Sequence, residues 1–166
     1  MKNVTPAQRQ VLHYLRDHNV ANLATGVGTD IWASAVFYAN DGYTLYFLSS
    51  PDSRHCLNFA RNPLVAVTIQ EDYADWREIK GIQIEGVVSE ISGPEEAVAR
   101  RIYGEKFPVV GKLALAPAAI VKALAKVSWF KIVPKRLYFI DNSVCLGHRE
   151  EIEVNLPQTY EIKPLP

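Results

Sequence analysis

One tight turn constrains the fold of this chain more than any other feature. Asn40-Asp41-Gly42 separates two runs that favour strands, Ile31–Tyr38 and Tyr43–Leu48. Asn, Asp and Gly accept the backbone angles of a hairpin turn, and the flanking runs are rich in β-branched and aromatic residues. We therefore expect two adjacent antiparallel strands joined by a short loop.

Further strands follow one another along the chain with few helices between them. We expect strands at Val20–Val27, Leu64–Ile69 and Ile79–Ile91, and a strand pair or one bent strand at Trp129–Asp141. Helices are expected at residues 6–19, 52–62, 92–104 and 116–126. Because the strands connect through hairpins and do not alternate with helices, the pattern predicts a mainly β domain with some helix. Its form would be a six- to seven-stranded antiparallel barrel with peripheral helices.

Three of the expected helices begin with capping signals. Thr5 with Gln8, and Ser92 with Glu95, have the spacing of a capping box, in which two side chains bond the free backbone N–H groups of the first turn. Asp52 is expected to cap the helix over residues 52–62.

Three residues within the expected strands indicate irregular pairing. Gly81 and Gly86 predict bends or bulges in the run Ile79–Ile91, and Pro134 predicts a bulge or an edge position in the last long strand.

Size and charge limit the class of protein. The 166 residues suit one domain, which we assign to 1–166. The formal net charge is zero, so no global field favours nucleic acid or anionic lipid, and an anion site would need a local cluster of donors. The sequence has neither a long apolar run nor a signal-peptide pattern, which favours a cytoplasmic protein without a membrane span. Cys56 and Cys145 are expected to be reduced thiols.

The stretch after the hairpin concentrates hydroxyl and basic groups. Ser49 and Ser50 end the strand, and Ser53, Arg54 and His55 fall in the first turn of the next helix. A helix start exposes unpaired N–H groups and partial positive charge, and an Arg offers two parallel donors to phosphate oxygens. The residues therefore favour a phosphate site, although an ordinary capped surface helix has the same composition.

The same stretch carries a family resemblance. "TLYFLSSPDSRHCLNFARNPLVAVTI" (residues 44–69) resembles the flavin-binding core of the pyridoxamine 5′-phosphate oxidase-like family, the FMN-binding split barrels. "IKGIQIEGVVSEI" is similar to the next strand of the family, "VPKRLYFIDN" to its closing strand, and "LGHRE" to its late basic segment. The resemblance extends from about Val11 to Arg149 and implies a split β-barrel.

The resemblance also implies a cofactor, FMN, held at the interface of a homodimer. Arg54 would hold the phosphate, with Ser49 and possible help from Ser50, and His55 stands where the oxidase often has lysine. Arg149 would come from the partner chain. The remaining cofactor-binding residues implied are Ala33, Ser34, Ala35, Val36, Leu48, Ser53, Lys80 and Gly81, of which 33–36 would line the isoalloxazine and 80–81 would come from the facing strand.

Departures from the family pattern bear on the reaction. Ala33 and Tyr38 stand where the oxidase has arginine and lysine, and residues 100–108 and 116–126 replace its vitamin B6 segment. We therefore expect an FMN-dependent oxidoreductase that acts on an unidentified small substrate, and not vitamin B6 oxidation. F420 could replace FMN. The alternatives are a haem-binding protein with His148 or His55 as axial ligand, and a flavin carrier or sensor without turnover.

Other residues leave narrower choices open. Tyr103 and Lys106 would contact substrate at the flavin or would simply end an amphipathic helix. Trp76 would stack on a ligand or anchor its loop. Cys145 and His148 have a spacing that could bind metal, but a structural zinc site needs about four ligands.

Overall fold

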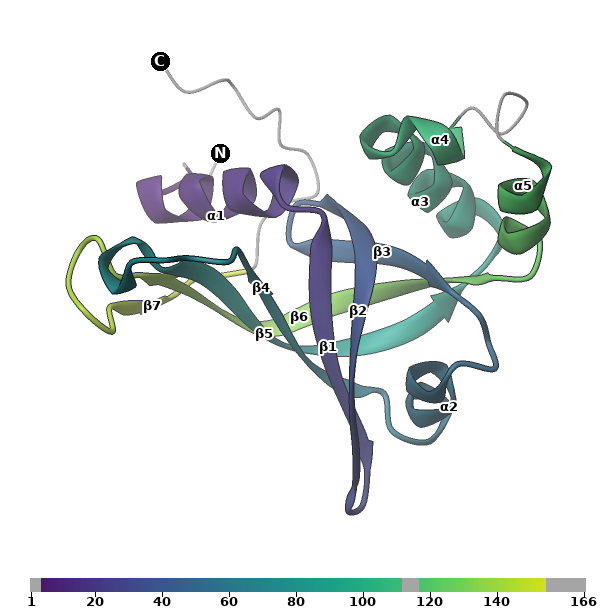
Figure 1. The fold of residues 1–166 in the computed structure, drawn as a ribbon, viewed down its shortest axis with the longest axis horizontal. Coiled ribbons are helices and arrows are strands. Elements are labelled where there is room, and N and C mark those ends of the chain that lie inside the picture. The colour runs from purple at the N-terminus through teal and green to yellow at the C-terminus, as the bar shows by residue number, and fades with distance from the viewer. Residues whose placement is uncertain (1–3, 112–116, 155–166) are drawn as a thin grey trace.

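Six antiparallel strands close into a barrel, and a seventh extends one edge (Figure 1). The computed structural model describes residues 4–111 and 117–154. The strand order is β3-β2-β1-β4-β5-β6-β7, and pairing of β3 with β6 closes the barrel. The strands are β1 (Val20–Val27), β2 (Asp30–Asp41), β3 (Thr44–Ser49), β4 (Leu64–Gln70), β5 (Lys80–Ile91), β6 (Ser128–Asp141) and β7 (Arg149–Glu151).

The predicted hairpin between β2 and β3 is confirmed, and a second hairpin joins β1 to β2. Asp41 pairs with Thr44 across the β2–β3 turn, where Gly42 has φ 55°, and Val27 pairs with Asp30 across the β1–β2 turn. Positive φ is the backbone region that glycine enters at no steric cost, so the turn residue and the turn geometry agree. The β1–β2 hairpin projects beyond the rest of the barrel in Figure 1.

The long strands β5 and β6 are bent at one shared point. The register shifts between Glu85 and Gly86, where Gly86 pairs with Pro134. A Cβ on Gly86 would lie 2.9 Å from Ile132 Cγ2, which explains why β5 needs glycine at this bend against β6. The bulges predicted at Gly86 and Pro134 are confirmed, and β6 is one bent strand. Gly81 pairs in regular register, so a bulge there is wrong.

The helices cover separate parts of the barrel. In Figure 1, α1 lies on the opposite side of the sheet from α2, which sits beside the β1–β2 hairpin, and α3 to α5 form a group of their own. The helix predicted at 116–126 begins later than expected, at Ala118, with Pro117 in the N-cap position. Ala116 lies outside the described residues. The helices are α1 (Pro6–Asp17), α2 (Arg54–Arg61), the 3-10 turn η1 (Trp76–Glu78), α3 (Gly93–Lys106), α4 (Pro108–Gly111) and α5 (Ala118–Leu124).

The capping predictions have different outcomes. The box at α1 is confirmed: the Gln8 N–H donates to Thr5 Oγ1 at 3.1 Å, and the Thr5 N–H donates to Gln8 Oε1 at 2.9 Å. Ser92 does precede α3, but its side chain makes no capping bond. The cap predicted at Asp52 is wrong, because Ser53 takes the N-cap position of α2. The hydroxyl of Ser53 bonds other side chains instead of the helix backbone.

Two groups of buried side chains hold these layers together. The larger fills the barrel and includes Leu23, Leu45, Phe47, Ile69, Ile82, Ile132 and Leu137. The smaller lies under α3 and consists of Ala39, Tyr46, Ile91, Ala99, Tyr103 and Trp129. Burying a large apolar side chain contributes about 1.5–3 kcal/mol, so these clusters fix the strands that carry the polar corner described next.

Among the helices that the structure describes, none has both the length and the apolar character needed to cross a membrane. Both cysteines are free thiols, Cys56 buried and Cys145 exposed.

Candidate functional site

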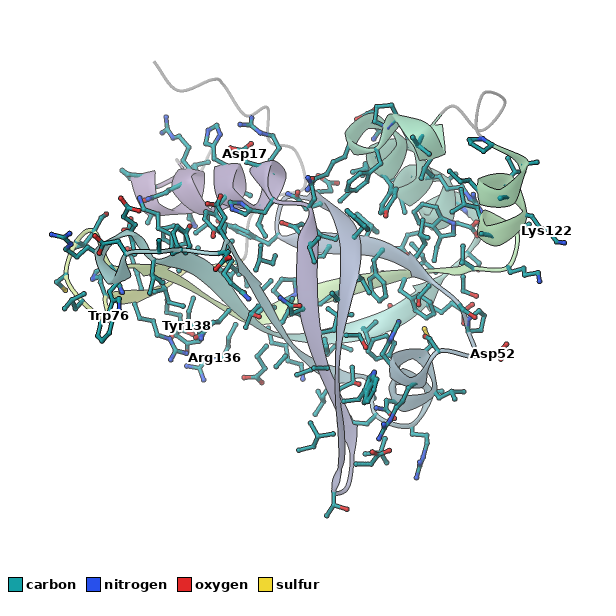
Figure 2. All side chains as sticks on the ribbon, viewed as in Figure 1. Asp17, Asp52, Trp76, Lys122, Arg136 and Tyr138 are labelled. Atoms are coloured by element: carbon teal, nitrogen blue, oxygen red, sulfur yellow. The ribbon has the colours of Figure 1, made fainter. Side chains whose placement is uncertain are left out.

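The hydroxyl-rich corner forms where the end of β3, the middle of β2 and the start of α2 meet. Ser49 is the last residue of β3, and Ser53 immediately precedes α2. A turn joins them, in which the Ser53 N–H donates to the Ser50 carbonyl at 3.0 Å. Ser50 itself is exposed, and Asp52, labelled in Figure 2, marks the same corner. The closed barrel therefore brings three segments of chain to one point.

His55 is the centre of this corner. Its Nε2 lies 2.7 Å from Ser49 Oγ and 3.1 Å from Ser53 Oγ, and its Nδ1 lies 3.1 Å from Ser34 Oγ on β2. The two hydroxyls on the Nε2 side are 3.3 Å apart. We call Ser34, Ser49, Ser53 and His55 the serine–histidine cluster. Four of the residues predicted for the cofactor site are thus in direct contact.

The cluster is shielded from water on the imidazole side. His55 is 9% exposed, and its ring packs edge-on against Phe59 at 5.7 Å between centroids. Burial lowers the pKa of His55, because an imidazolium is less well solvated there. Burial also raises the pKa of the neighbouring Cys56 thiol, against the effect of its hydrogen bonds to Ser53 and Ser49. The thiol therefore stays protonated, which does not suit a nucleophile.

Arg54 faces the β1–β2 hairpin in this structure. Its guanidinium forms an ion pair with Asp30 and lies 4.3 Å over the ring of Trp32. About half of each charged side chain remains exposed. Sequence reasoning missed both Asp30 and Trp32 as neighbours of Arg54, because nothing in the local pattern of β2 links them to α2. Arg54 is therefore adjacent to His55 in sequence, but its guanidinium pairs with Asp30 and not with the serine–histidine cluster.

The face of β2 opposite Ser34 is exposed and carries small side chains. Ala33 and Ala35 lie on the outer face of β2, whereas Ser34 and Val36 point inward. Ala33 pairs with Ala24 on β1, which pairs in turn with Ala66 on β4. All three alanines are exposed, so small side chains form a row across three strands. We call Ala24, Ala33, Ala35 and Ala66 the alanine face; Leu48, also predicted for the site, packs instead against the smaller core.

Lys80, Gly81 and Arg149 lie elsewhere in the chain. Ser49 pairs with Ser128 at the start of β6, whereas Lys80 pairs with Asp141 at its end. At about 3.3 Å per residue, the two ends of β6 are roughly 40 Å apart along the strand. A single chain therefore does not bring these three residues to the serine–histidine cluster.

This second set has contacts of its own. Lys80 forms an ion pair with Asp141 at 3.2 Å, and the Arg149 guanidinium lies 3.9 Å over the ring of Tyr138. In Figure 2, Tyr138 and Trp76 lie on the opposite side of the molecule from Asp52. A shallow pocket of about 250 Å³ opens here, lined by residues that include Gln70, Lys80, Gly81 and Gln83.

Tyr103 and Lys106 have structural surroundings. Tyr103 is 4% exposed in the smaller core, where it packs edge-on against Trp129. The Lys106 ammonium donates to the carbonyls of Leu15 at 3.2 Å and His18 at 2.5 Å, near the end of α1. These contacts favour the interpretation of a helix end docked on the barrel over that of substrate contacts. Trp76 is 76% exposed.

The fold defines the class of protein. A closed six-stranded antiparallel barrel with an added strand and peripheral helices is the architecture of the split barrels. The family model for pyridoxamine 5′-phosphate oxidase matches residues 5–141, so the chain belongs to that family.

Individual relatives agree with this assignment. A UPF0306 protein of Photorhabdus laumondii is 36% identical over 103 residues, which cover 60% of this chain and 72% of the relative. The haem-storage protein HutZ of Vibrio cholerae has a TM-score of 0.63 at 18% identity, covering 77% of this chain and 90% of HutZ. An FAD-binding protein of Mesorhizobium loti has a TM-score of 0.60 at 19% identity, covering 87% and 93%. At these identities, the solved structures show a shared fold alone.

Proposed function

We propose that this protein is a homodimeric flavoprotein that binds FMN and acts as an oxidoreductase on a small substrate. The observation that carries the proposal is the serine–histidine cluster at the start of α2, with Arg54 next to it in sequence; the alanine face lies on the other side of β2 from Ser34. The cluster offers donors for a phosphate, and the alanine face offers a surface of small side chains for a planar ring.

The donors at the corner suit a phosphate dianion. Ser49 and Ser53 present hydroxyls that are hydrogen-bonded to His55 Nε2, and the first turn of α2 presents backbone N–H groups that have no partner within the helix. Arg54 adds its guanidinium to the site once the phosphate replaces Asp30 as its ion-pair partner. The donor set is neutral or positive on the α2 side, as an anion site requires.

A second copy of the chain would complete the site. The alanine face lacks side chains large enough to cover a flavin ring alone, and Ile31 and Phe37 on the same face are 74% and 58% exposed. A two-fold dimer that packs this face would bury these side chains and bring the partner's residue set toward the ring. In this arrangement Lys80, Gly81 and Arg149 act on the cofactor of the other protomer.

Bound FMN supplies hydride and electron transfer, and the chain supplies position and polarity. The serine–histidine cluster holds the phosphate end, and the backbone of β2 lies along the ring. Strand-edge N–H groups suffice to stabilise charge on the ring, so no paired carboxylate or triad is needed. The substrate would reach the ring from the side that the alanine face leaves open.

The substrate is not expected to be a vitamin B6 phosphate. Tyr38 stands where the oxidase has lysine, and here it is 1% exposed with its hydroxyl bonded to the Leu15 carbonyl at 2.7 Å. Ala33 stands where the oxidase has arginine and offers no donor. The described residues at these two positions therefore cannot bind a second phosphate, which favours a substrate without one.

Haem is the second candidate, and one observation favours it. His148 is half-buried in the turn between β6 and β7, where Val144 and Leu146 are each 65% exposed. An imidazole among exposed apolar side chains suits a haem face and an axial bond. His55 is less suited, because both of its ring nitrogens already have hydroxyl partners.

Spectra of the purified protein test both candidates. FMN gives a yellow protein whose visible bands bleach on reduction, and denaturation releases a compound with the mass of FMN. A Soret band that disappears in His148→Ala but persists in His13→Ala would replace flavin by haem. Colourless protein that binds neither added FMN nor added haem would refute both.

A further inference from the structure

We propose that binding of a phosphate at the serine–histidine cluster is coupled to uptake of one proton by His55. The inference rests on the proposed function and names how that site is regulated by pH. Its basis is the geometry of one imidazole held between hydroxyls on both sides, 2.7 Å from Ser49 Oγ and 3.1 Å from Ser34 Oγ.

Counting hydrogens shows why the proton matters. A neutral imidazole has one N–H, so one ring nitrogen must accept a hydrogen from a serine. An imidazolium donates from both nitrogens, so Ser49 and Ser53 can each turn their own O–H outward. Protonation therefore frees hydroxyl donors and adds a positive charge at the corner, and both changes favour an anion.

The free protein resists this protonation. His55 is 9% exposed, and burial lowers its pKa from the ordinary value near 6.5. A phosphate dianion bound to the Ser49 and Ser53 hydroxyls acts in the opposite direction, because its negative charge near the ring stabilises the imidazolium. Since the pKa rises on binding, the complex takes up a proton from solvent at pH values between the free and bound pKa values.

Other charged groups lie near the cluster, and the test must distinguish their effect on phosphate binding from that of His55. Arg54 and Cys56 flank it on α2, Asp30 lies on β2, and Glu90 on β5 is close enough to influence the Cys56 thiol. Asp52 lies in the turn before the helix. All of them remain in a His55→Gln variant, whose amide does not titrate over the pH range used. That variant is therefore the matched control.

The test measures FMN affinity by flavin fluorescence at pH 6.5, 7.5 and 8.5. Wild type should lose up to about tenfold in affinity per pH unit while the bound-state pKa is above the pH, whereas His55→Gln should change less than about threefold over the range. Riboflavin, which has no phosphate, should show no such slope. The phosphate of FMN is almost fully dianionic over most of this range, and its remaining titration affects the measured affinity of both proteins equally.

Calorimetry of the wild type alone gives a second readout. The binding enthalpy in buffers of different ionisation enthalpy should report uptake of close to one proton at pH 7 with FMN and none with riboflavin. FMN binding that is equally tight at all three pH values, without proton uptake, would overturn the coupling and leave the proposed function intact. Absence of any FMN binding would instead refute the proposed function.

Discussion

The Arg54 guanidinium lies 4.3 Å over the ring of Trp32 and pairs with Asp30, so the β1–β2 hairpin holds the strongest cation of the corner. The side chain that the sequence assigns to a phosphate thus has an anionic partner already. A phosphate ligand would compete with Asp30 for it. Exposed ion pairs of this kind contribute about 0–1 kcal/mol to stability, so a phosphate can replace Asp30 at small free-energy cost.

Removing that competitor should strengthen phosphate binding. In Asp30→Asn the guanidinium keeps its stacking on Trp32 and loses its ion pair, so FMN affinity should rise by about two- to fivefold at low salt. Flavin fluorescence titration measures it. Asp52→Asn, which removes an equal charge from the turn before α2 but leaves the Asp30 pair, should change affinity less. Weaker FMN binding by Asp30→Asn would show that the pair positions Arg54 for the ligand.

The sequence predicted the components of the site better than their geometry. Serines at a strand end followed by Arg54 and His55 indicated an anion site, and the structure joins Ser34, Ser49, Ser53 and His55. Local patterns say which groups are near a helix start. They do not say that a strand residue such as Asp30 will face the helix, because that depends on closure of the barrel.

Substitution of Gly86 should destabilise the barrel. A Cβ there would lie 2.9 Å from Ile132 Cγ2 and 3.0 Å from the Val133 carbonyl, and the second contact is with backbone that cannot rotate away. Gly86→Ala should lower the free energy of unfolding by about 1–3 kcal/mol in urea denaturation. Ser89→Ala, at an exposed position of the same strand, should change it by less than about 0.5 kcal/mol. Equal effects of the two variants would contradict the bulge geometry.

Lys106 should stabilise the junction of α1 and α3. Its ammonium bonds two carbonyls near the end of α1 and lies 4.3 Å over the Tyr38 ring. Lys106→Met keeps the length of the side chain but loses the hydrogen bonds to both carbonyls, so the unfolding free energy at pH 7 should fall by about 1–3 kcal/mol. Lys122→Met is the control, because Lys122 points outward from α5 in Figure 2 and should be neutral to stability. Lys106→Met as stable as wild type would contradict the role.

The same lysine should give stability a pH dependence. Burial lowers the pKa of Lys106 to about 8, below the value of an unfolded chain near 10.4. Between these values the unfolded chain binds the proton that the folded chain releases, so the unfolding free energy contributed by Lys106 rises with pH. Thermal unfolding from pH 7.5 to 10 should show that the stability difference between wild type and Lys106→Met grows with pH. A constant difference would mean that the amine titrates normally.

A charge on the alanine face should break the proposed dimer. Ala24 is exposed and pairs with Ala33 and Ala66, so an arginine at this position would have to enter the packed interface. Ala24→Arg should be monomeric by light scattering at micromolar concentration and should bind FMN more weakly, because the partner's residue set is lost.

Two comparisons make this outcome interpretable. Ala97→Arg adds the same charge to the exposed face of α3 and should remain dimeric, and circular dichroism should show that both variants fold. A dimeric Ala24→Arg with unchanged FMN affinity would place the interface elsewhere.

Features of the fold that depend on local sequence patterns were predictable, whereas those that depend on contacts in the folded chain were not. Turn residues, strand runs and Gly86 act locally, so the β2–β3 hairpin and the bulge were predicted. Capping depends on what else a hydroxyl can reach. Thr5 has only the helix start and caps it, whereas Ser53 bonds Ser49 and His55 instead.

The most direct test is an equilibrium titration of the purified protein with FMN and with riboflavin at pH 7. If the corner holds a phosphate, FMN should bind at one per chain and at least about tenfold more tightly than riboflavin, since charge-assisted hydrogen bonds contribute about 1.5–3 kcal/mol. Equal affinity for the two flavins, or binding of neither, would contradict the assignment of the serine–histidine cluster and Arg54 to the phosphate.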